Sequence, residues 1–203
     1  MYAVVLAAGR GERFGGDKLL ARWRGRPLLW HVLAQLRPAL EGGVLAGGCV
    51  VVPPDAPALA ALAREAGLAP VPNPTPAAGL GSSLRVGVDW LTDRVDDRSA
   101  AAVIYLGDQP AVPPDVLVRL VGAWTRGDGL VVRPQYAGAP SEPGHPALVD
   151  RSLWGLANQL TGDAGLGSLL APRGIPVVTI EAPGRNPDVD TRTDLLNLEG
   201  TER

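Results

Sequence analysis

A glycine-rich loop with three cations follows the first apolar run of this chain. Residues 8–18 spell AGRGERFGGDK and include Arg10, Arg13 and Lys18. Lys18 is the only lysine, and the other 18 of the 19 basic residues are arginines. Glycines let backbone N–H groups approach an anion closely, and three nearby cations suit a triphosphate. The loop therefore predicts a site for a highly charged phosphate ligand.

Two common phosphate-binding motifs nearly fit this loop, and both fail. A dinucleotide-binding loop needs Gly-x-Gly-x-x-Gly, and Phe14 stands where the third glycine belongs. A P-loop needs Gly-Lys-Ser/Thr, whereas Asp17 precedes Lys18 and Leu19 follows it. The loop thus has its own layout, and Phe14 disfavours a dinucleotide-dependent reductase.

Short apolar runs alternate with helical patterns around this loop. The expected strands span 2–7, 47–53, 69–72, 101–107, 129–134 and 176–180. The expected helices span 27–40, 56–67, 82–95 and 113–127, with a Gly/Pro loop at 137–146 and further helical pieces near 151–160 and 164–171. This alternation predicts an α/β fold with three layers, in which a mostly parallel, twisted, Rossmann-like sheet carries helices on both faces.

Composition restricts the classes of protein to consider. The 203 residues include 46% apolar and 20% charged residues, with a net charge of −2 and one cysteine. This balance predicts a single folded domain over 1–203, without nucleic acid as a partner, a disulfide framework or a Cys-rich zinc site. No apolar stretch approaches the roughly 20 residues of a membrane span, and no leader is apparent, so we expect a cytoplasmic protein without a membrane partner.

Ligands of such sheets bind outside the carboxyl ends of the strands. This rule selects three loops, at 8–18, 73–83 and 107–112. Asp108 directly follows the strand expected at 101–107, and carboxylates at strand ends suit Mg²⁺.

The motifs then match a known family in order along nearly the whole chain. Leu6 to Lys18 resembles the loop Leu-Ala-(Ala/Gly)-Gly-x-x-x-Arg-(Met/Phe)-Gly-x-x-Lys of nucleotidyltransferases with the GT-A-type fold. GLGSSL (79–84), LGDQPAV (106–112), GHPALV (144–149) and DVDTRTDL (188–195) are similar to later motifs of the molybdenum cofactor nucleotidyltransferases (MobA-like NTP transferases), above all the cytidylyltransferase branch.

The resemblance implies transfer of a nucleoside monophosphate from an NTP to a phosphate acceptor, with release of pyrophosphate. Such chemistry depends on in-line positioning and charge neutralisation. Lys18 would follow the charge that moves from the α-phosphate to the bridging oxygen, and Arg13 would hold the β- and γ-phosphates. The loop residues expected to bind the nucleotide are Leu6, Ala7, Ala8, Gly9, Arg10 and Gly11.

The resemblance also implies a metal site and a base pocket. Asp108 and Asp190 would bind Mg²⁺ beside Lys18; Asp188 is the alternative second ligand, and a helix N-cap is the alternative role of Asp190. Gly81 and Ser82 would line the base pocket, although Ser82 or Ser83 is also expected to cap the helix.

The identity of the base depends on Ala8. Guanylyl-transferring relatives carry glycine at this point, so the methyl group of Ala8 favours a pyrimidine and therefore CTP. Uridylyl-transferring relatives share the alanine.

The sequence motifs identify the acceptor substrate less specifically than the nucleotide. His145 contacts the second substrate or stabilises its own loop, and Gly167 stands where cytidylyltransferases have an arginine. The leading interpretation is CTP-dependent modification of molybdopterin, with a molybdoenzyme or its chaperone as a further partner. The alternatives are a guanylyltransferase, a sugar-1-phosphate nucleotidyltransferase, or a non-catalytic module that binds and delivers the cofactor. Retention of Lys18, Asp108 and Asp190 together argues against a non-catalytic module.

Overall fold

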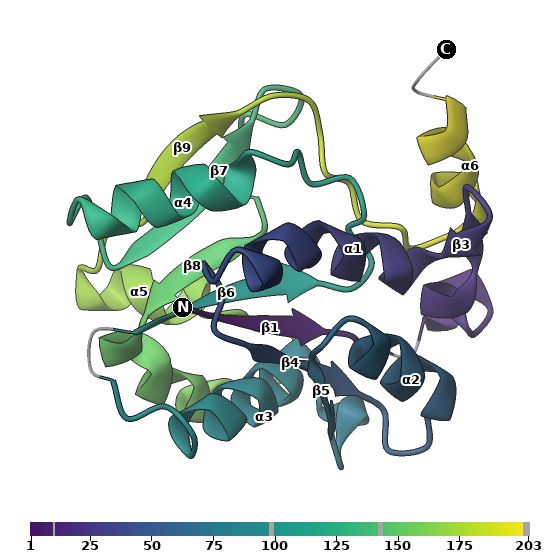
Figure 1. The fold of residues 1–203 in the computed structure, drawn as a ribbon, viewed down its shortest axis with the longest axis horizontal. Helices are drawn as coiled ribbons and strands as arrows, with labels where there is room; N and C mark the ends of the chain where they lie inside the picture. Colours follow the sequence, from purple (N-terminus) through teal and green to yellow (C-terminus); the bar gives the residue numbers. More distant parts are fainter. Residues whose placement is uncertain (10, 98–99, 142–143, 201–203) are drawn as a thin grey trace.

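A mixed sheet forms the centre of the molecule (Figure 1). The computed structural model describes residues 1–9, 11–97, 100–141 and 144–200. Within these ranges, seven strands pair in the order β5-β4-β1-β6-β8-β7-β9. The strands are β1 (Tyr2–Leu6), β4 (Gly48–Val52), β5 (Ala69–Pro72), β6 (Ala101–Leu106), β7 (Val131–Tyr136), β8 (Ala147–Asp150) and β9 (Val178–Ala182).

Helices cover both faces, so the predicted three-layer α/β fold is confirmed. In β1, Ala3 and Val5 point to one face and Val4 and Leu6 to the other, as the period of two requires. One face packs on α1 (Leu28–Glu41), α2 (Pro57–Glu65) and α4 (Val116–Thr125). The other packs on α3 (Leu80–Thr92), η4 (Arg151–Gln159) and α5 (Gly167–Leu170).

Strand β8 differs from the expected pattern. No strand was expected between residues 134 and 176, but residues 147–150 form a largely buried strand that pairs antiparallel with both β6 and β7. Within the described residues, the other neighbouring strands of this sheet are paired parallel. A four-residue strand gives little periodicity, and its insertion between β6 and β7 depends on distant pairing.

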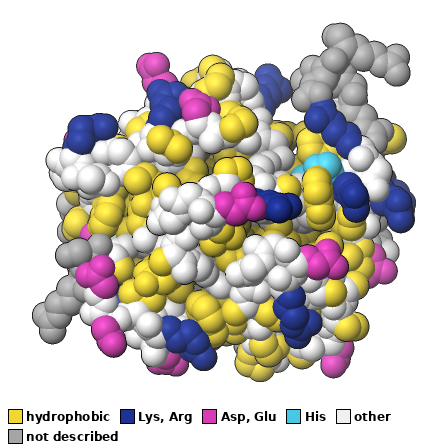
Figure 2. Space-filling model, viewed as in Figure 1, with side chains coloured by type: hydrophobic (Ala, Val, Ile, Leu, Met, Phe, Trp, Pro, Cys, Tyr) yellow, Lys and Arg dark blue, Asp and Glu magenta, His cyan; other side chains and the backbone are white. Residues whose placement is uncertain are grey.

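A two-stranded hairpin of β2 (Arg22–Trp23) and β3 (Arg26–Pro27) precedes α1 and was not predicted. Its turn residues, Arg24 and Gly25, both have positive φ (49° and 77°), as a type I′ turn requires. The Arg24 guanidinium stacks on the Trp23 ring at 4.6 Å. Figure 2 shows basic side chains gathered at this edge of the molecule, over β3.

The start of α3 corrects a second expectation. The helix begins at Leu80 with Gly79 as its N-cap residue, so neither Ser82 nor Ser83 caps it. Gly79 has a φ of 87°, and a Cβ there would lie 2.4 Å from the backbone of Gly162. The close approach of these two loops therefore requires glycine and fixes where the helix begins.

The elements place the predicted loops at one edge. Strands β1, β4, β5 and β6 run parallel, so the segments that follow them emerge together at their carboxyl ends. The C-terminal segment also returns to this edge and ends in α6 (Arg192–Gly200), where the Arg192 guanidinium lies 5.2 Å from the centre of the Phe14 ring. Within the described residues, no helix combines the length and apolar character that crossing a membrane demands.

The remaining helical turns are short 3₁₀ segments. They are η1 (Glu12–Phe14), η2 (Lys18–Leu20), η3 (Pro76–Ala78) and η5 (Ala171–Arg173). The helical piece expected near 151–160 is also 3₁₀, and the piece expected near 164–171 divides into α5 and η5.

Candidate active site

A cleft of about 740 Å³ opens at the carboxyl ends of β1 and β6. The glycine-rich loop, the start of α3 and the C-terminal segment contribute to its walls. The expected nucleotide, catalytic and metal residues that line it are Leu6, Ala7, Ala8, Gly9, Gly11, Arg13, Lys18, Asp108 and Asp190, together with the alternative ligand Asp188. Residues from both ends of the chain thus meet in one cavity, as expected. Arg10 lies outside the described residues.

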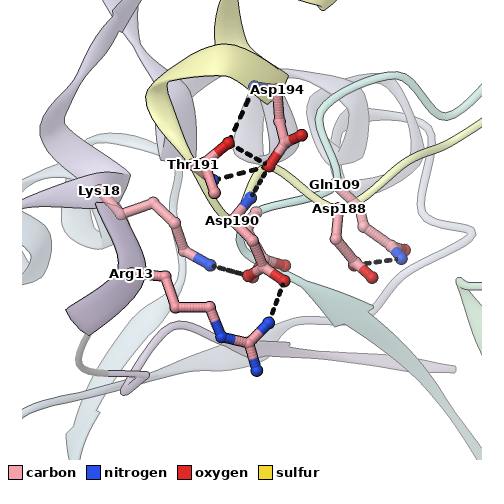
Figure 3. Close-up of polar contacts among 8 residues, drawn as sticks. Arg13, Lys18, Gln109, Asp188, Asp190, Thr191 and Asp194 are labelled. Atoms are coloured by element: carbon pink, nitrogen blue, oxygen red, sulfur yellow. Dashed lines mark hydrogen bonds and ion pairs between the residues drawn. The ribbon is translucent and has the colours of Figure 1, made fainter. Parts of the chain in front are cut away.

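Lys18 bridges two carboxylates at the floor of the cleft (Figure 3). Its Nζ donates hydrogen bonds to Oδ2 of Asp108 at 2.7 Å and to Oδ1 of Asp190 at 3.1 Å. The Lys18 side chain is only 11% exposed. Burial acts to lower the pKa of Lys18, but the two carboxylates outweigh it and raise the pKa above its usual value. Lys18 is therefore an ammonium at neutral pH.

Backbone conformation delivers Lys18 to this position. Gly11 has a φ of 60°, and a Cβ there would lie 3.0 Å from the Cβ of Lys18. Asp17 also adopts the left-handed conformation, with a φ of 47°, directly before Lys18 begins η2. Such backbone is uncommon for residues other than glycine and is often found at functional sites.

Arg13 adds a second cation from the rim. Its guanidinium donates to Oδ2 of Asp190 at 3.3 Å, while its side chain is 80% exposed. An ion pair this exposed contributes little to folding stability. Arg13 is therefore available to bind a ligand without cost to the fold.

Asp188 and Asp190 differ in their partners. The Asp188 carboxylate accepts a hydrogen bond from Nε2 of Gln109 at 2.7 Å, whereas Asp190 accepts from Lys18 and Arg13. Partial burial, followed by the charge of Asp108, raises the pKa of Asp188 despite that hydrogen bond. Asp190 thus shares the cation with Asp108, and Asp188 lies beside the pair.

The donor set fits a divalent cation that arrives with phosphate. Among the described residues, no cluster of three or more His, Cys, Asp or Glu could enclose a metal ion by itself. Asp108 and Asp190 nevertheless converge on one cation, the Lys18 ammonium. Magnesium sites in nucleotide enzymes commonly use one or two carboxylates and complete their shell with substrate phosphates and water.

The loop that carries Asp190 is fixed by a capping box, in which the expected helix N-cap falls one residue after Asp190. Thr191, rather than Asp190, is the N-cap residue of α6, since Oγ1 of Thr191 accepts from the backbone N–H of Asp194 at 3.2 Å. In return, Oδ2 of Asp194 accepts from the backbone N–H of Thr191 at 2.7 Å and from that of Asp190 at 3.1 Å. These hydrogen bonds leave the Asp190 carboxylate directed at Lys18.

Asn186 was also missed, and it ties three loops together. Its side chain donates to Oε1 of Gln109 and to the backbone carbonyl of His145, and accepts from the backbone N–H of Ala111. The network joins the Asp108 loop to the C-terminal acidic segment. An asparagine between two loops carries no periodic pattern, so only the folded chain reveals this role.

Gly81 and Ser82 do not line the cleft. Ser82 is buried, where its hydroxyl donates to the carbonyl of Gly79 at 2.8 Å and accepts from Asn73 at 2.9 Å. Gly81 packs against Leu160. Their neighbours Gly79, Leu80 and Ser83 line the cleft instead. The structure thus places the 79–84 motif at the cleft but shifts which of its residues face the cavity.

His145 lines a second pocket, of about 320 Å³, that adjoins the cleft. The two cavities share the side chains of Leu6, Leu80 and Leu106. Most of the lining residues of this pocket are apolar, and Arg133 is the cation among them. An extended ligand could therefore span both cavities.

The environment of His145 leads to a stability prediction. Burial, followed by the charge of Arg133, lowers the pKa of His145 to about 3. The folded protein keeps this imidazole neutral between pH 6.5 and 3, whereas the unfolded chain protonates it. The free energy of unfolding should therefore decrease as the pH is lowered through this window. The contribution of this group is up to about 1.4 kcal/mol per pH unit.

Urea denaturation of the wild type and of His145→Asn at several pH values between 8 and 4.5 checks this prediction. The free energy of unfolding of the wild type should decrease relative to that of the variant below pH 6.5. Parallel curves for the two proteins would contradict it.

The fold and the site together define the family to which the chain belongs. A mostly parallel sheet presents a glycine-rich loop, a lysine and two carboxylates to one cleft. One carboxylate follows β6 and the other lies in the C-terminal segment. Residues 3–179 match the MobA-like NTP transferase domain, and the chain belongs to that family. Nucleotidyltransferases of this kind generally use a divalent metal.

Individual relatives agree with this assignment. The chain is 31% identical over 186 residues to the bifunctional enzyme IspD/IspF of Rhodospirillum rubrum, covering 90% of this chain and 44% of that protein. It is 40% identical over 119 residues to the molybdenum cofactor guanylyltransferase of Pseudomonas putida strain F1, covering 58% of this chain and 55% of that one. The match thus spans about half the length of these relatives.

Solved structures are similar over the full length. Rv0371c from Mycobacterium tuberculosis H37Rv superposes with a TM-score of 0.78 at 30% identity, and the match covers 99% of this chain and 98% of that one. A manganese complex of Rv0371c has a TM-score of 0.75 at 29% identity, with 98% of each chain covered.

Proposed function

We propose that the cleft transfers the nucleoside monophosphate of an NTP to a phosphate group of a small acceptor. The observation that carries the proposal is the convergence of Lys18, Arg13, Asp108 and Asp190 in one cavity. An acceptor phosphate oxygen attacks the α-phosphorus, the bond from the α-phosphorus to the bridging oxygen breaks, and pyrophosphate leaves. Lys18 neutralises the charge that moves to the bridging oxygen, and Arg13 binds the outer phosphates.

Mg²⁺ is the proposed cofactor. Asp108 and Asp190 would hold it together with the phosphates of the NTP, and it supplies neutralisation of phosphate charge when bound. The chain's own contribution is to orient these carboxylates through Asn186 and Asp194, which fix the two segments that bear them.

CTP is the proposed nucleotide. Ala8 is 1% exposed and lines the cleft, so its methyl group takes space that a glycine would leave open to a larger base. GTP is the second candidate, because the Pseudomonas putida relative is named a guanylyltransferase.

The adjoining pocket supports an acceptor of the molybdopterin kind. Its walls are formed mainly by leucine, valine and alanine side chains, which suit a flat ring system better than a polyol that would need many hydrogen-bond partners. Arg133 would meet an anionic group of this acceptor. Gly167 lines the same pocket, so Arg133 supplies a cation there although position 167 does not.

Pyrophosphate release with CTP, GTP, UTP and ATP, each with Mg²⁺ and a molybdopterin acceptor, tests the proposal. We expect release with CTP. In parallel, the preferred nucleotide at 100 times its Kd should stabilise the protein by about 2.7 kcal/mol in thermal unfolding. Nucleotide-dependent stabilisation without pyrophosphate release from any acceptor would favour a non-catalytic binding module instead.

Ala8→Gly tests the choice of base. Removing the methyl group should raise kcat/KM for GTP relative to CTP by about tenfold or more, the scale of one methyl group in a pocket. An unchanged ratio, with CTP still preferred, would show that Ala8 does not select the base.

A further inference from the structure

The carboxylates expected to bind metal are already occupied by cations of the protein itself (Figure 3). Both oxygens of Asp190 accept hydrogen bonds, one from Lys18 at 3.1 Å and the other from Arg13 at 3.3 Å. Oδ2 of Asp108 accepts from Lys18 at 2.7 Å. Three of the four oxygens that could coordinate a metal are therefore engaged by an ammonium or a guanidinium.

An ammonium and a divalent cation cannot share this position. Two like charges about 4 Å apart repel each other by several kcal/mol even at an effective dielectric constant near 20. Lys18 is mostly buried, so water screens it less than it screens Arg13 at the rim. The metal can therefore reach the carboxylates only when Lys18 leaves them.

The Lys18 side chain has a second position available within the cleft. Lys18 ends the glycine-rich loop, and it lines the cleft together with Gly9, Gly11 and Arg13, where phosphate oxygens would lie. A lysine is a point charge on a flexible four-carbon stem, so it can move from carboxylate to phosphate by rotation of its side chain.

We propose that Lys18 is a stand-in cation, which holds Asp108 and Asp190 together in the nucleotide-free enzyme and excludes metal until phosphates draw it away. The proposal rests on the proposed function only in naming those phosphates as those of an NTP. Metal and nucleotide should then bind with positive coupling, since each favours the state without the Lys18–carboxylate bonds. The nucleotide-free protein should bind metal weakly.

Binding of Mn²⁺ in the absence of nucleotide, followed by electron paramagnetic resonance of the free ion, tests this idea. Lys18→Met should bind Mn²⁺ about tenfold more tightly than the wild type. Arg126→Met is the matched control, because it removes one positive charge from an exposed ion pair with Asp128 that does not line the cleft. The control should bind Mn²⁺ as the wild type does. Equal or weaker binding by Lys18→Met would overturn the proposal.

A second measurement uses the unmodified protein, so it does not depend on the variant folding. Because Lys18 is the sole lysine, ¹⁵N-lysine labelling gives a single side-chain ammonium resonance. Inorganic triphosphate should shift this resonance, whereas Mg²⁺ alone at the same concentration should leave it in place. A shift with Mg²⁺ alone and none with triphosphate would overturn the proposal. Neither readout requires turnover, so a failure to release pyrophosphate would refute the proposed function and leave these results standing.

Discussion

Replacement of Lys18 by methionine is expected to lower kcat by about 100- to 1,000-fold, the cost of removing one preorganised group that stabilises transition-state charge. Methionine has nearly the length of lysine but no charge. The KM for the nucleotide should change less than kcat, because Arg13 still contacts the outer phosphates. Pyrophosphate release under single-turnover conditions measures the effect, and circular dichroism establishes that the variant is folded.

Lys18→Arg is the informative companion. It keeps the positive charge but replaces a compact ammonium with a planar fork. If the chain requires lysine here for its point charge, this variant should recover only a small part of the lost rate. Activity of Lys18→Met within threefold of the wild type would remove Lys18 from the reaction. The same activity in Lys18→Arg would show only that any cation suffices at this position.

Asp108→Asn is expected to have an effect of similar size. The change removes one carboxylate from the pair that meets Lys18 at 2.7 Å and 3.1 Å, while it keeps the shape of the side chain. We expect kcat to fall about 100-fold or more, and saturating Mg²⁺ to restore only part of it. Steady-state rates at increasing Mg²⁺ measure both.

The neighbouring aspartates supply the controls. Asp190→Asn should resemble Asp108→Asn, because both carboxylates hold the same cation. Asp188→Asn should retain most of the rate, since its carboxylate is bound by Gln109. Asp115→Asn, on the exposed start of α4, should behave as the wild type. If Asp188→Asn lost more activity than Asp190→Asn, Asp188 would be the second metal ligand.

The sequence predicted the parts of the molecule that local chemistry dictates. Apolar runs that alternate with helical patterns predicted the layers. They also predicted the ends of most strands to within two residues, because a strand buried on both faces is a continuous apolar run. The rule that ligands bind at carboxyl ends predicted that the loops at 8–18 and 107–112 would meet, and the contact of Lys18 with Asp108 confirms that placement. The catalytic roles of these residues remain predictions.

Features that depend on distant contacts were not predictable from the sequence. Strand β8 exists because β6 and β7 lie on either side of it. Ser82 faces inward because α3 begins at Leu80, a boundary set by the contact between Gly79 and Gly162. Asn186 acts through three loops that lie far apart in the sequence. In each case the decisive partner is remote along the chain.

The C-terminal segment has a consequence for biosynthesis. Asp190 is 172 residues from Lys18, yet the two are in contact. During translation, the ribosome finishes β1, its glycine-rich loop and the next five strands of the sheet long before Asp190 emerges. A nascent chain can therefore assemble most of its core while one of the two carboxylates is still missing. Prematurely terminated products of this kind would carry the glycine-rich loop, Lys18 and Asp108 but lack Asp190 and the capping box that orients it.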